Sequence, residues 1–305
     1  MTLQHPPYEF GSAEHNNAEA LIALALSEDL GQRGDLTAEA TIPSEATGAA
    51  RFVARQSGIL AGLPVVALIA QRFGLAQGFV PERSDGDPLE PGTLIARVSG
   101  PMRAILSMER TALNFLQRLS GIATQTHRFV LAVEGTHAAI LDTRKTTPGW
   151  RWLEKYAVRC GGGANHRIGL FDAVLIKDNH LAWLASSGDP IGRAITAARQ
   201  LAPPGTTVEV EVDTLDQFDR ALSCRPDIVL LDNFTHHDLA EAVRRRDASS
   251  STVLLEASGG IDLASVAEVA RTGVDRISVG AITHSAPSLD IGLDEEIVRD
   301  SHRSC

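Results

Sequence analysis

From about residue 137 onward the chain alternates short apolar runs with helix-like segments, and this alternation constrains its fold more than any other feature. The apolar runs are 138–141, 173–176, 208–212, 228–231, 253–255 and 277–279. The segments with helical spacing are 152–160, 191–201, 215–222, 237–246 and 263–271. Strands that alternate with helices predict a parallel sheet. So many units in so short a stretch favour an α/β barrel with fewer than eight strands, although periodicity alone does not exclude an open sheet.

The first third of the chain follows a different pattern. Helical spacing is found at 16–30, 63–73 and 102–119, and strand-like runs at 51–55 and 93–98. Turn-forming residues fill 31–43 and 81–92. This mixture predicts a separate α+β region before the alternating part.

Composition excludes several classes of protein. The net charge of −10 argues against a nucleic-acid partner, because nucleic-acid-binding domains present a basic surface. No apolar run is long enough to span a membrane, and the N-terminus does not have the pattern of a signal peptide. The three cysteines have no metal-ligand spacing and suggest no disulfide framework. We therefore expect a cytoplasmic protein without a membrane or nucleic-acid partner.

Polar side chains follow every one of the six apolar runs. They are Asp142–Lys145, Lys177–His180, Glu209, Glu211 and Asp213, Asp232–Asn233, Glu256 with Ser258–Gly260, and Gly280 with Thr283 and His284. Each residue alone has a second explanation, because Asp and Asn often cap the following helix. In a barrel, however, the carboxyl ends of the strands converge on one mouth, where active sites lie. Six strands that end this way predict a site there.

Cations are concentrated between residues 142 and 180, a segment that contains all three lysines of the chain. Arg144, Lys145, His166, Arg167 and Lys177 fall at strand ends or in loops, where site residues are common. Such a concentration in an acidic protein indicates an anionic ligand, because Arg binds carboxylate or phosphate through two hydrogen bonds and Lys acts as a point charge.

Three further cations in this segment, Arg151, Lys155 and Arg159, share one helical face. Their regular spacing favours a solvated or interface face over a ligand-binding role.

Two further motifs extend the predicted site. Ser258–Asp262 places glycines before a helix, where main-chain amides bind phosphate, and Val279–Ala281 fits a partner loop. A tight turn capped by Asp262 explains the first motif equally well.

The second motif is an acid pair. Glu211 and Asp232 each end an apolar run and should face the cations. They could hold a divalent metal or offset positive charge on a sugar. The alternative is an ion pair with Lys145 or Lys177.

Together these residues resemble quinolinate phosphoribosyltransferase, a family of carboxylating pyrophosphorylases. The matching motifs are EDLGQRGDLT, ERTALNFLQRLSGIAT, DTRKTTPG, EKYAVRCGGGANHR, LIKDNH, EVEVD, LLDNF, SGGI and GVDRISVGAITHS. They occur in the expected order between about residues 20 and 293, and no site position departs from the pattern.

The resemblance implies both a reaction and a fold. Phosphoribosyl pyrophosphate and quinolinate would give nicotinate mononucleotide, pyrophosphate and CO₂, with Mg²⁺, as a step in NAD synthesis. An N-terminal α/β open sandwich (1–120) would precede an irregular barrel with fewer than eight strands (121–285). A tail (286–305) would pack back on the first domain. The protein would be a homodimer with shared active sites, or a hexamer of dimers.

The resemblance also implies the roles of individual residues. Arg144, His166 and Arg167 would bind the quinolinate carboxylates, with Thr143 beside them and Arg110 reaching across the dimer. Lys145 and Lys177 would meet the ligand carboxylate and the phosphates. Glu211 and Asp232 would bind the ribose or Mg²⁺. The phosphate oxygens would be held by Ser258, Gly259, Gly280 and His284.

Three rival functions remain open. A paralogue acting on nicotinate or another anionic ring, or a homologue from a molybdate-transport operon, would share the fold but should lack part of the double-carboxylate clamp. A Schiff-base aldolase would use Lys177. A non-catalytic module would bind a nucleotide without turnover.

Overall fold

The computed structural model describes residues 9–185, 188–249 and 251–296. The chain forms two compact units, and neither is a single stretch of sequence. One contains residues 1–127, 147–162 and 286–305, and the other contains 128–146 and 163–285. In this division, residues 147–162 and the C-terminal stretch belong to the first unit.

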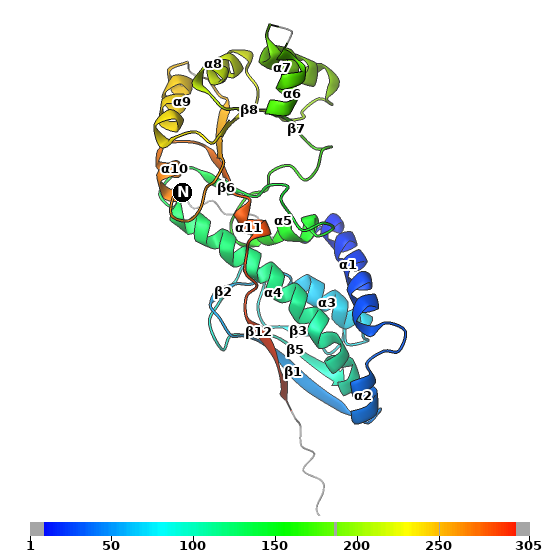
Figure 1. Cartoon of the computed structure of the whole chain (residues 1–305). Helices are drawn as coiled ribbons and strands as arrows, with labels where there is room; N and C mark the ends of the chain where they lie inside the picture. The colour runs from blue at the N-terminus through cyan, green and yellow to red at the C-terminus, as the bar shows by residue number, and fades with distance from the viewer. Residues whose placement is uncertain (1–8, 186–187, 250, 297–305) are drawn as a thin grey trace, which may run out of the picture. The chain divides into compact units, whose positions relative to one another are not determined.

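The first unit is built on an antiparallel sheet with strand order β12-β1-β5-β3 (Figure 1). These strands are β12 (Ile291–Glu296), β1 (Thr47–Ala54), β5 (Leu94–Pro101) and β3 (Val80–Pro81). A two-stranded sheet joins β2 (Gly58–Ile59) to β4 (Pro88–Leu89). Alternate residues of β1 and β5, among them Ala50 and Phe52 in β1 and Ala96 and Val98 in β5, are fully buried, which is the pattern of a sheet with one covered face.

The helices of this unit are α1 (Ser12–Leu30), α2 (Leu36–Thr41), α3 (Leu63–Arg72), α5 (Arg151–Cys160) and the first part of α4 (Met102–Ala132). α1 packs on both α3 and α5. Asp35 begins α2, because its carboxylate accepts the Ala38 amide hydrogen. The cap creates a helix inside the stretch 31–43, which the sequence predicts as turns.

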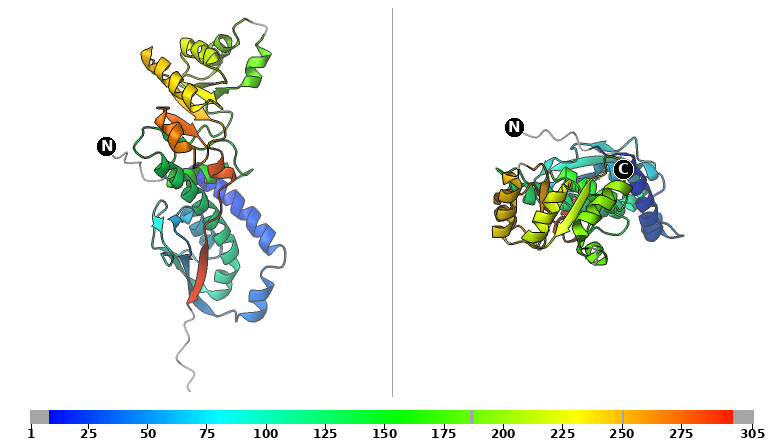
Figure 2. Two further views of the ribbon diagram at one scale, coloured as in Figure 1. Left: turned by 60° about the vertical axis from the view of Figure 1, so that its left-hand side comes forward. Right: turned by 90° about the horizontal axis from the view of Figure 1, so that it is seen from above.

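Strand β12 lies far from its neighbour in sequence. It pairs with β1 in antiparallel register, Ala50 opposite Glu295 and Phe52 opposite Leu293 (Figure 2). Without β12, β1 would be an open edge with unpaired main-chain groups.

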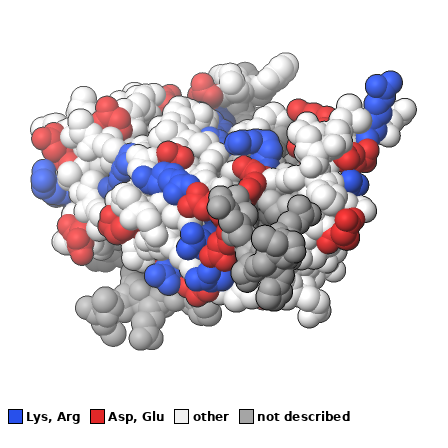
Figure 3. All heavy atoms as spheres, turned by 90° about the horizontal axis from the view of Figure 1, so that it is seen from below, with Lys and Arg blue, Asp and Glu red and all other residues white. Residues whose placement is uncertain are grey.

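Arginines on this sheet have acidic partners. Arg51 and Arg97 contact Glu296, and Arg55 contacts Asp294. Figure 3 shows the same mixture of acidic and basic side chains over one face of the molecule. On that face the positive charges are not gathered into one field.

An ion pair between Arg118 and the buried Glu154 lies at the two places where the chain re-enters the first unit, residues 147 and 286. The Glu154 carboxylate is fully buried and accepts from the hydroxyl of Thr147 (2.8 Å) and the guanidinium of Arg118 (2.8 Å). Arg118 also donates to the Ala286 carbonyl at 3.0 Å. Thr147 follows Arg144–Thr146 in sequence, and Ala286 follows His284 and Ser285. The Arg118–Glu154 ion pair therefore anchors the chain directly after residues 144–146 and directly after residues 284–285, which belong to two loops of the predicted site.

The second unit is a six-stranded parallel sheet with strand order β6-β11-β10-β9-β8-β7 (Figure 1). The strands are β6 (Ala139–Leu141), β11 (Arg276–Ser278), β10 (Leu254–Ser258), β9 (Ile228–Asp232), β8 (Val208–Val212) and β7 (Val174–Ile176). The connecting helices are α6 (Asp178–Trp183), α7 (Pro190–Leu201), α8 (Leu215–Cys224), α9 (His236–Ala248), α10 (Val266–Arg271) and α11 (Ala281–His284). This is the predicted α/β architecture with fewer than eight strands, and no β6–β7 pairing closes the sheet within the described residues.

The alternation of valine and glutamate along β8 gives this strand one apolar face for the core and one acidic face for the site. All five residues of β8 are buried, and valine alternates with glutamate. Successive side chains of a strand point to opposite faces, so Glu209 and Glu211 share the face opposite the valines. Among the described residues, no helix is long and apolar enough to cross a bilayer.

Candidate functional site

A cavity of about 460 Å³ opens at the carboxyl ends of the parallel strands. Its walls are formed by Thr143, Arg144, Lys145, His166, Arg167, Leu175, Lys177, Glu211, Leu230, Asp232, Ser258 and Ser278. Nine of the thirteen residues predicted from the sequence line this cavity, and all of them belong to the second unit.

A larger cavity, of about 970 Å³, lies near the amino ends of β9 and β10. Its walls include serines, Asp219 and Asp227, with Arg225 as a basic residue. Size favours this cavity, but chemistry favours the smaller one, because polar groups of several strands converge only at the carboxyl ends of a parallel sheet.

Asp142, at the end of β6, organises the loop that carries His166 and Arg167. Its side chain is fully buried. One carboxylate oxygen accepts the His166 amide hydrogen at 2.8 Å, and the other accepts from the Asn165 side chain at 2.7 Å. Main-chain bonds between Ala164 and β6 complete the attachment. The loop that carries His166 and Arg167 is thus anchored to the end of β6 by a buried acid.

Arg144 and Arg167 give the cavity an excess of positive charge. Burial lowers the pKa of Arg167, and the neighbouring charge of Arg144 lowers it further. The Arg167 guanidinium donates to the Ala173 carbonyl at 3.1 Å, which fixes its direction. Two guanidinium groups that repel each other are stabilised by an anion between them. This part of the cavity is therefore suited to a carboxylate or phosphate.

Opposite these cations, Lys177 and Glu211 form an ion pair of 2.5 Å. The sequence left open whether Glu211 would bind a ligand or a lysine, and in the structure it contacts Lys177. Asp232, at the end of β9, accepts a hydrogen bond from the Asn233 side chain at 2.7 Å. Both carboxylates line the cavity. They offer hard oxygen atoms of the kind that Mg²⁺ prefers, so the donor set fits that ion.

The glycines of the predicted phosphate loops allow close packing. Gly259 has a φ of +100°, and a Cβ there would lie 2.9 Å from the Asn233 main-chain nitrogen. At Gly280 a Cβ would lie 3.0 Å from the Lys145 side chain and 3.2 Å from the His284 ring. The Thr283 hydroxyl donates to the Lys145 carbonyl at 2.8 Å. This hydrogen bond holds α11 against the loop that follows β6.

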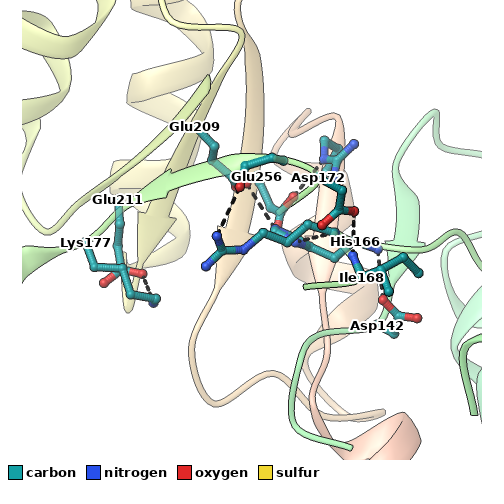
Figure 4. A network of polar contacts seen from close by, with 11 residues as sticks. Asp142, His166, Ile168, Asp172, Lys177, Glu209, Glu211 and Glu256 are labelled. Atoms are coloured by element: carbon teal, nitrogen blue, oxygen red, sulfur yellow. Dashed lines mark hydrogen bonds and ion pairs between the residues drawn. The ribbon is translucent and has the colours of Figure 1, made fainter. Parts of the chain in front are cut away.

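Beneath the cavity, His166 lies between two buried acids, Glu209 and Glu256 (Figure 4). Burial lowers the pKa of the His166 imidazole, but the hydrogen bond to Glu209 and the charge of Glu256 outweigh it, so the pKa is raised. Burial also raises the pKa of Glu256, and the charge of Glu209 adds to that effect. The Arg276 guanidinium balances part of this charge through a 2.7 Å bond to Glu256.

Four predicted site residues are not among those lining the cavity. Gly259, Gly280 and His284 lie in the loops next to it, as the packing above shows. Arg110 belongs to α4 in the first unit. Its predicted role in a partner's site is not tested by a single chain.

The sequence places Asp142, Glu209 and Glu256 among the polar residues of the predicted site but assigns none of them an individual role. The alternation of EVEVD was a usable signal for Glu209, because it places that residue on the same face as Glu211. The predicted solvated or interface face of 151–159 needs correction, since Lys155 is fully buried and Arg159 pairs with Glu14.

The fold and the cavity define an α/β protein with a six-stranded parallel sheet and an arginine- and lysine-lined site suited to an anionic ligand. Two family models cover most of the chain. The quinolinate phosphoribosyl transferase C-terminal domain matches residues 122–294, and the N-terminal domain matches residues 35–120.

Similar proteins agree with these matches. A carboxylating nicotinate-nucleotide pyrophosphorylase of Mycobacterium leprae is 47% identical over 92% of this chain and 98% of its own length. A probable enzyme of the same name from Bacillus subtilis is 42% identical over 95% and 98%. The solved nicotinate-nucleotide pyrophosphorylase of Francisella tularensis superposes with a TM-score of 0.84 at 38% identity, covering 97% and 99% of the two chains. The chain belongs to the quinolinate phosphoribosyl transferase family.

Proposed function

We propose that the protein transfers the phosphoribosyl group of phosphoribosyl pyrophosphate to quinolinate with loss of CO₂, giving nicotinate mononucleotide and pyrophosphate. The observation that carries the proposal is the cavity itself, in which Arg144, Lys145, Arg167 and Lys177 face the carboxylates Glu211 and Asp232. The family assignment and the names of the similar proteins support the same reaction.

Charge explains why such a site is needed. Quinolinate carries two carboxylates and phosphoribosyl pyrophosphate carries several further negative charges, so the two repel each other in water. Arg144 and Arg167, with His166 beside them, take the quinolinate carboxylates. Lys145 and the loops of Ser258 and Gly280 take the phosphates. Holding the two anions side by side lowers the entropic barrier to their reaction.

Side chains of the protein then stabilise the charges that develop on the leaving group and on the sugar. The pyridine nitrogen attacks the anomeric carbon as pyrophosphate leaves, and the lysines stabilise the negative charge of the leaving group. Glu211 or Asp232 offsets positive charge on the sugar. The quaternary ring nitrogen withdraws electrons, so the adjacent carboxylate leaves as CO₂, and the ring carbon that keeps the electron pair takes a proton from water. Mg²⁺, held by Glu211 and Asp232 directly or through water, would supply further charge neutralisation on the phosphates.

The Lys177–Glu211 pair also bears on a rival function. A Schiff-base lysine needs its side-chain nitrogen directed at a carbonyl carbon, whereas Nζ of Lys177 contacts the Glu211 carboxylate at 2.5 Å. The geometry therefore favours a phosphate- or carboxylate-binding role for Lys177.

We further propose a homodimer in which Arg110 of one subunit completes the site of the other. The support is the position of Arg110 in the matched motif ERTALN and its place in the unit that does not contain the cavity. Assembly into hexamers would keep the same pairs.

The decisive experiment measures CO₂ and pyrophosphate released from quinolinate plus phosphoribosyl pyrophosphate, with nicotinate as the comparison substrate. We expect both products from quinolinate and little turnover with nicotinate. Arg144→Ala or Lys145→Ala should lower turnover by about two or more orders of magnitude without unfolding the protein, because each removes a charge aimed at the reacting anions. Equal turnover of nicotinate, or full activity in either folded variant, would contradict the assignment.

A further inference from the structure

Two buried acids, Glu209 and Glu256, contact the same nitrogen of the His166 ring. Nε2 lies 3.0 Å from a Glu209 oxygen and 3.5 Å from a Glu256 oxygen. The three side chains are 8%, 4% and 0% exposed, so solvent does not compete for these contacts. Neither glutamate is among the residues that line the cavity, whereas His166 is.

The other ring nitrogen is also engaged by the protein. Nδ1 accepts the main-chain N–H of Arg167 at 2.8 Å. A ring nitrogen that accepts a hydrogen bond carries a lone pair, so the ring proton belongs on Nε2, where it is donated to Glu209. Both nitrogens therefore contact the protein, and the ring connects the buried acids to the main chain of Arg167.

From this geometry we infer that Glu209 and Glu256 are positioning residues of the anion site, and that they act through His166. The acids hold the ring as its Nε2–H tautomer, and Nδ1 then fixes the Arg167 main chain and with it the guanidinium that lines the cavity. The identity of the anion as quinolinate rests on the proposed function. Within that function, His166 contributes to carboxylate binding through Arg167 and not through a ring nitrogen on the ligand.

A metal ion is the competing explanation for this group, because its ligand atoms lie within 4.8 Å of one another. A metal on Nε2 would need that nitrogen's lone pair and would move the proton to Nδ1, toward the Arg167 N–H. The Arg276 guanidinium already donates a hydrogen bond to the second oxygen of Glu256 at 2.7 Å. The hydrogen-bond directions thus favour the Nε2–H tautomer over a metal centre.

The tautomer is measured directly by ¹⁵N NMR of histidine-labelled protein, without ligand and with quinolinate. His180 is an internal reference, because its Nδ1 accepts the Lys177 amide at 2.9 Å while its ring is exposed. The expected result is an unprotonated Nδ1 on His166 in both states, measured at a pH above the raised pKa of its ring. A proton on Nδ1, a doubly protonated ring in the quinolinate complex, or a shift on adding Mn²⁺ or Zn²⁺ would overturn the inference.

Two substitutions separate an indirect role from a direct one. His166→Asn keeps an acceptor near the position of Nδ1, and His166→Gln moves the polar group toward the position of Nε2. We expect Asn to keep the KM for quinolinate within about threefold and Gln to raise it about tenfold, the effect of leaving one buried amide without an acceptor. The KM for phosphoribosyl pyrophosphate should stay within about twofold in both. The reverse order would assign His166 to the ligand.

The acids are tested by Glu256→Gln, with Glu241→Gln, on helix α9 and not among the residues that line the cavity, as the control. Glu256→Gln should raise the quinolinate KM severalfold while the control does not, and thermal melting reports whether the variant folds. An unchanged KM in folded Glu256→Gln contradicts the inference; if the variant does not fold, the tautomer measurement decides. If the unmodified protein shows no turnover, the proposed function fails, while the tautomer in ligand-free protein still tests the geometry.

Discussion

Replacing Gly259 with alanine tests whether the packing of the phosphate loop sets the position of Asp232. Gly259 has a φ of +100°, which L side chains rarely adopt, and a Cβ there would lie 2.7 Å from the Asn233 side-chain carbon and 2.9 Å from its main-chain nitrogen. Asn233 must therefore move. Its amide donates to the Ser258 carbonyl at 2.9 Å, and its side chain donates to Asp232 at 2.7 Å.

The expected size of the effect follows from those contacts. The backbone conformation costs about 1–2 kcal/mol for a residue with a Cβ. Loss of the Asn233–Ser258 bond adds about 0.5–1.5 kcal/mol. Gly259→Ala should thus lower the free energy of unfolding by about 1.5–3.5 kcal/mol. The neighbouring Gly260 is the matched control, because its φ of +59° is accessible to alanine at about 1 kcal/mol and a Cβ there would meet nothing within 4 Å.

Urea unfolding followed by circular dichroism measures the stability of both variants, and initial rates give the KM for phosphoribosyl pyrophosphate. We expect Gly259→Ala to be the less stable variant and to show a raised KM, because Asp232 and Ser258 shift with Asn233. Equal stability of the two variants, or an unchanged KM in Gly259→Ala, would refute the packing argument.

Three other predictions concern separate parts of the molecule. Asp142→Ala should lose about 2–3 kcal/mol of stability and most activity, because the His166 amide and Asn165 lose a buried acceptor; a fully active variant in an unfolding and turnover assay would contradict this. Arg110→Ala should be inactive alone, and mixing it with Lys145→Ala should restore part of the activity; no recovery in mixed subunits would count against a shared site. Arginine partners hold the pKa values of Asp189 and Glu241 at about 2, below their ordinary values, so their stabilising effect is present above about pH 4 and is lost as the pH falls toward 2. Acid unfolding curves of Asp189→Asn and Glu241→Gln should be shallower in that window, and unaltered curves would show that these pairs contribute nothing.

The sequence predicts the parallel unit well because its strands are short apolar runs between clear helices. The run 208–212 coincides with β8, and the other strands shift by no more than three residues at either end. The helix predicted from Leu263 begins only at Val266. The reason is local, since the Asp262 carboxylate accepts the amides of Ala264 and Ser265 and holds a turn there.

Elsewhere the sequence prediction falls short because the determining contacts are distant. The helix predicted to end at Leu119 continues as α4 to Ala132, through Gly121. A Cβ at Gly121 would lie 3.0 Å from Ser288 Cα, so that glycine serves close packing and does not end the helix. Strand β12 carries no family motif and is determined by its pairing with β1.

The site was predictable to the extent that its residues end strands. Polar residues after apolar runs placed nine side chains around one cavity. The orientation of His166 was not predictable, because it depends on Glu256, which is ninety residues away in sequence, and on which ring nitrogen the Arg167 amide contacts.

The pairing of β12 with β1 has a consequence for synthesis on the ribosome. The first unit holds the N-terminal sheet, yet that sheet lacks an outer strand until nearly the whole chain has been translated. Contacts this distant in sequence form slowly, and the exposed edge of β1 would attract other strands in the meantime. The parallel unit, whose strands end at Ser278, can assemble first. Expression of residues 1–120 alone should therefore give an aggregating fragment, and a chain carrying residues 286–296 fused ahead of β1 would be the design to compare with it.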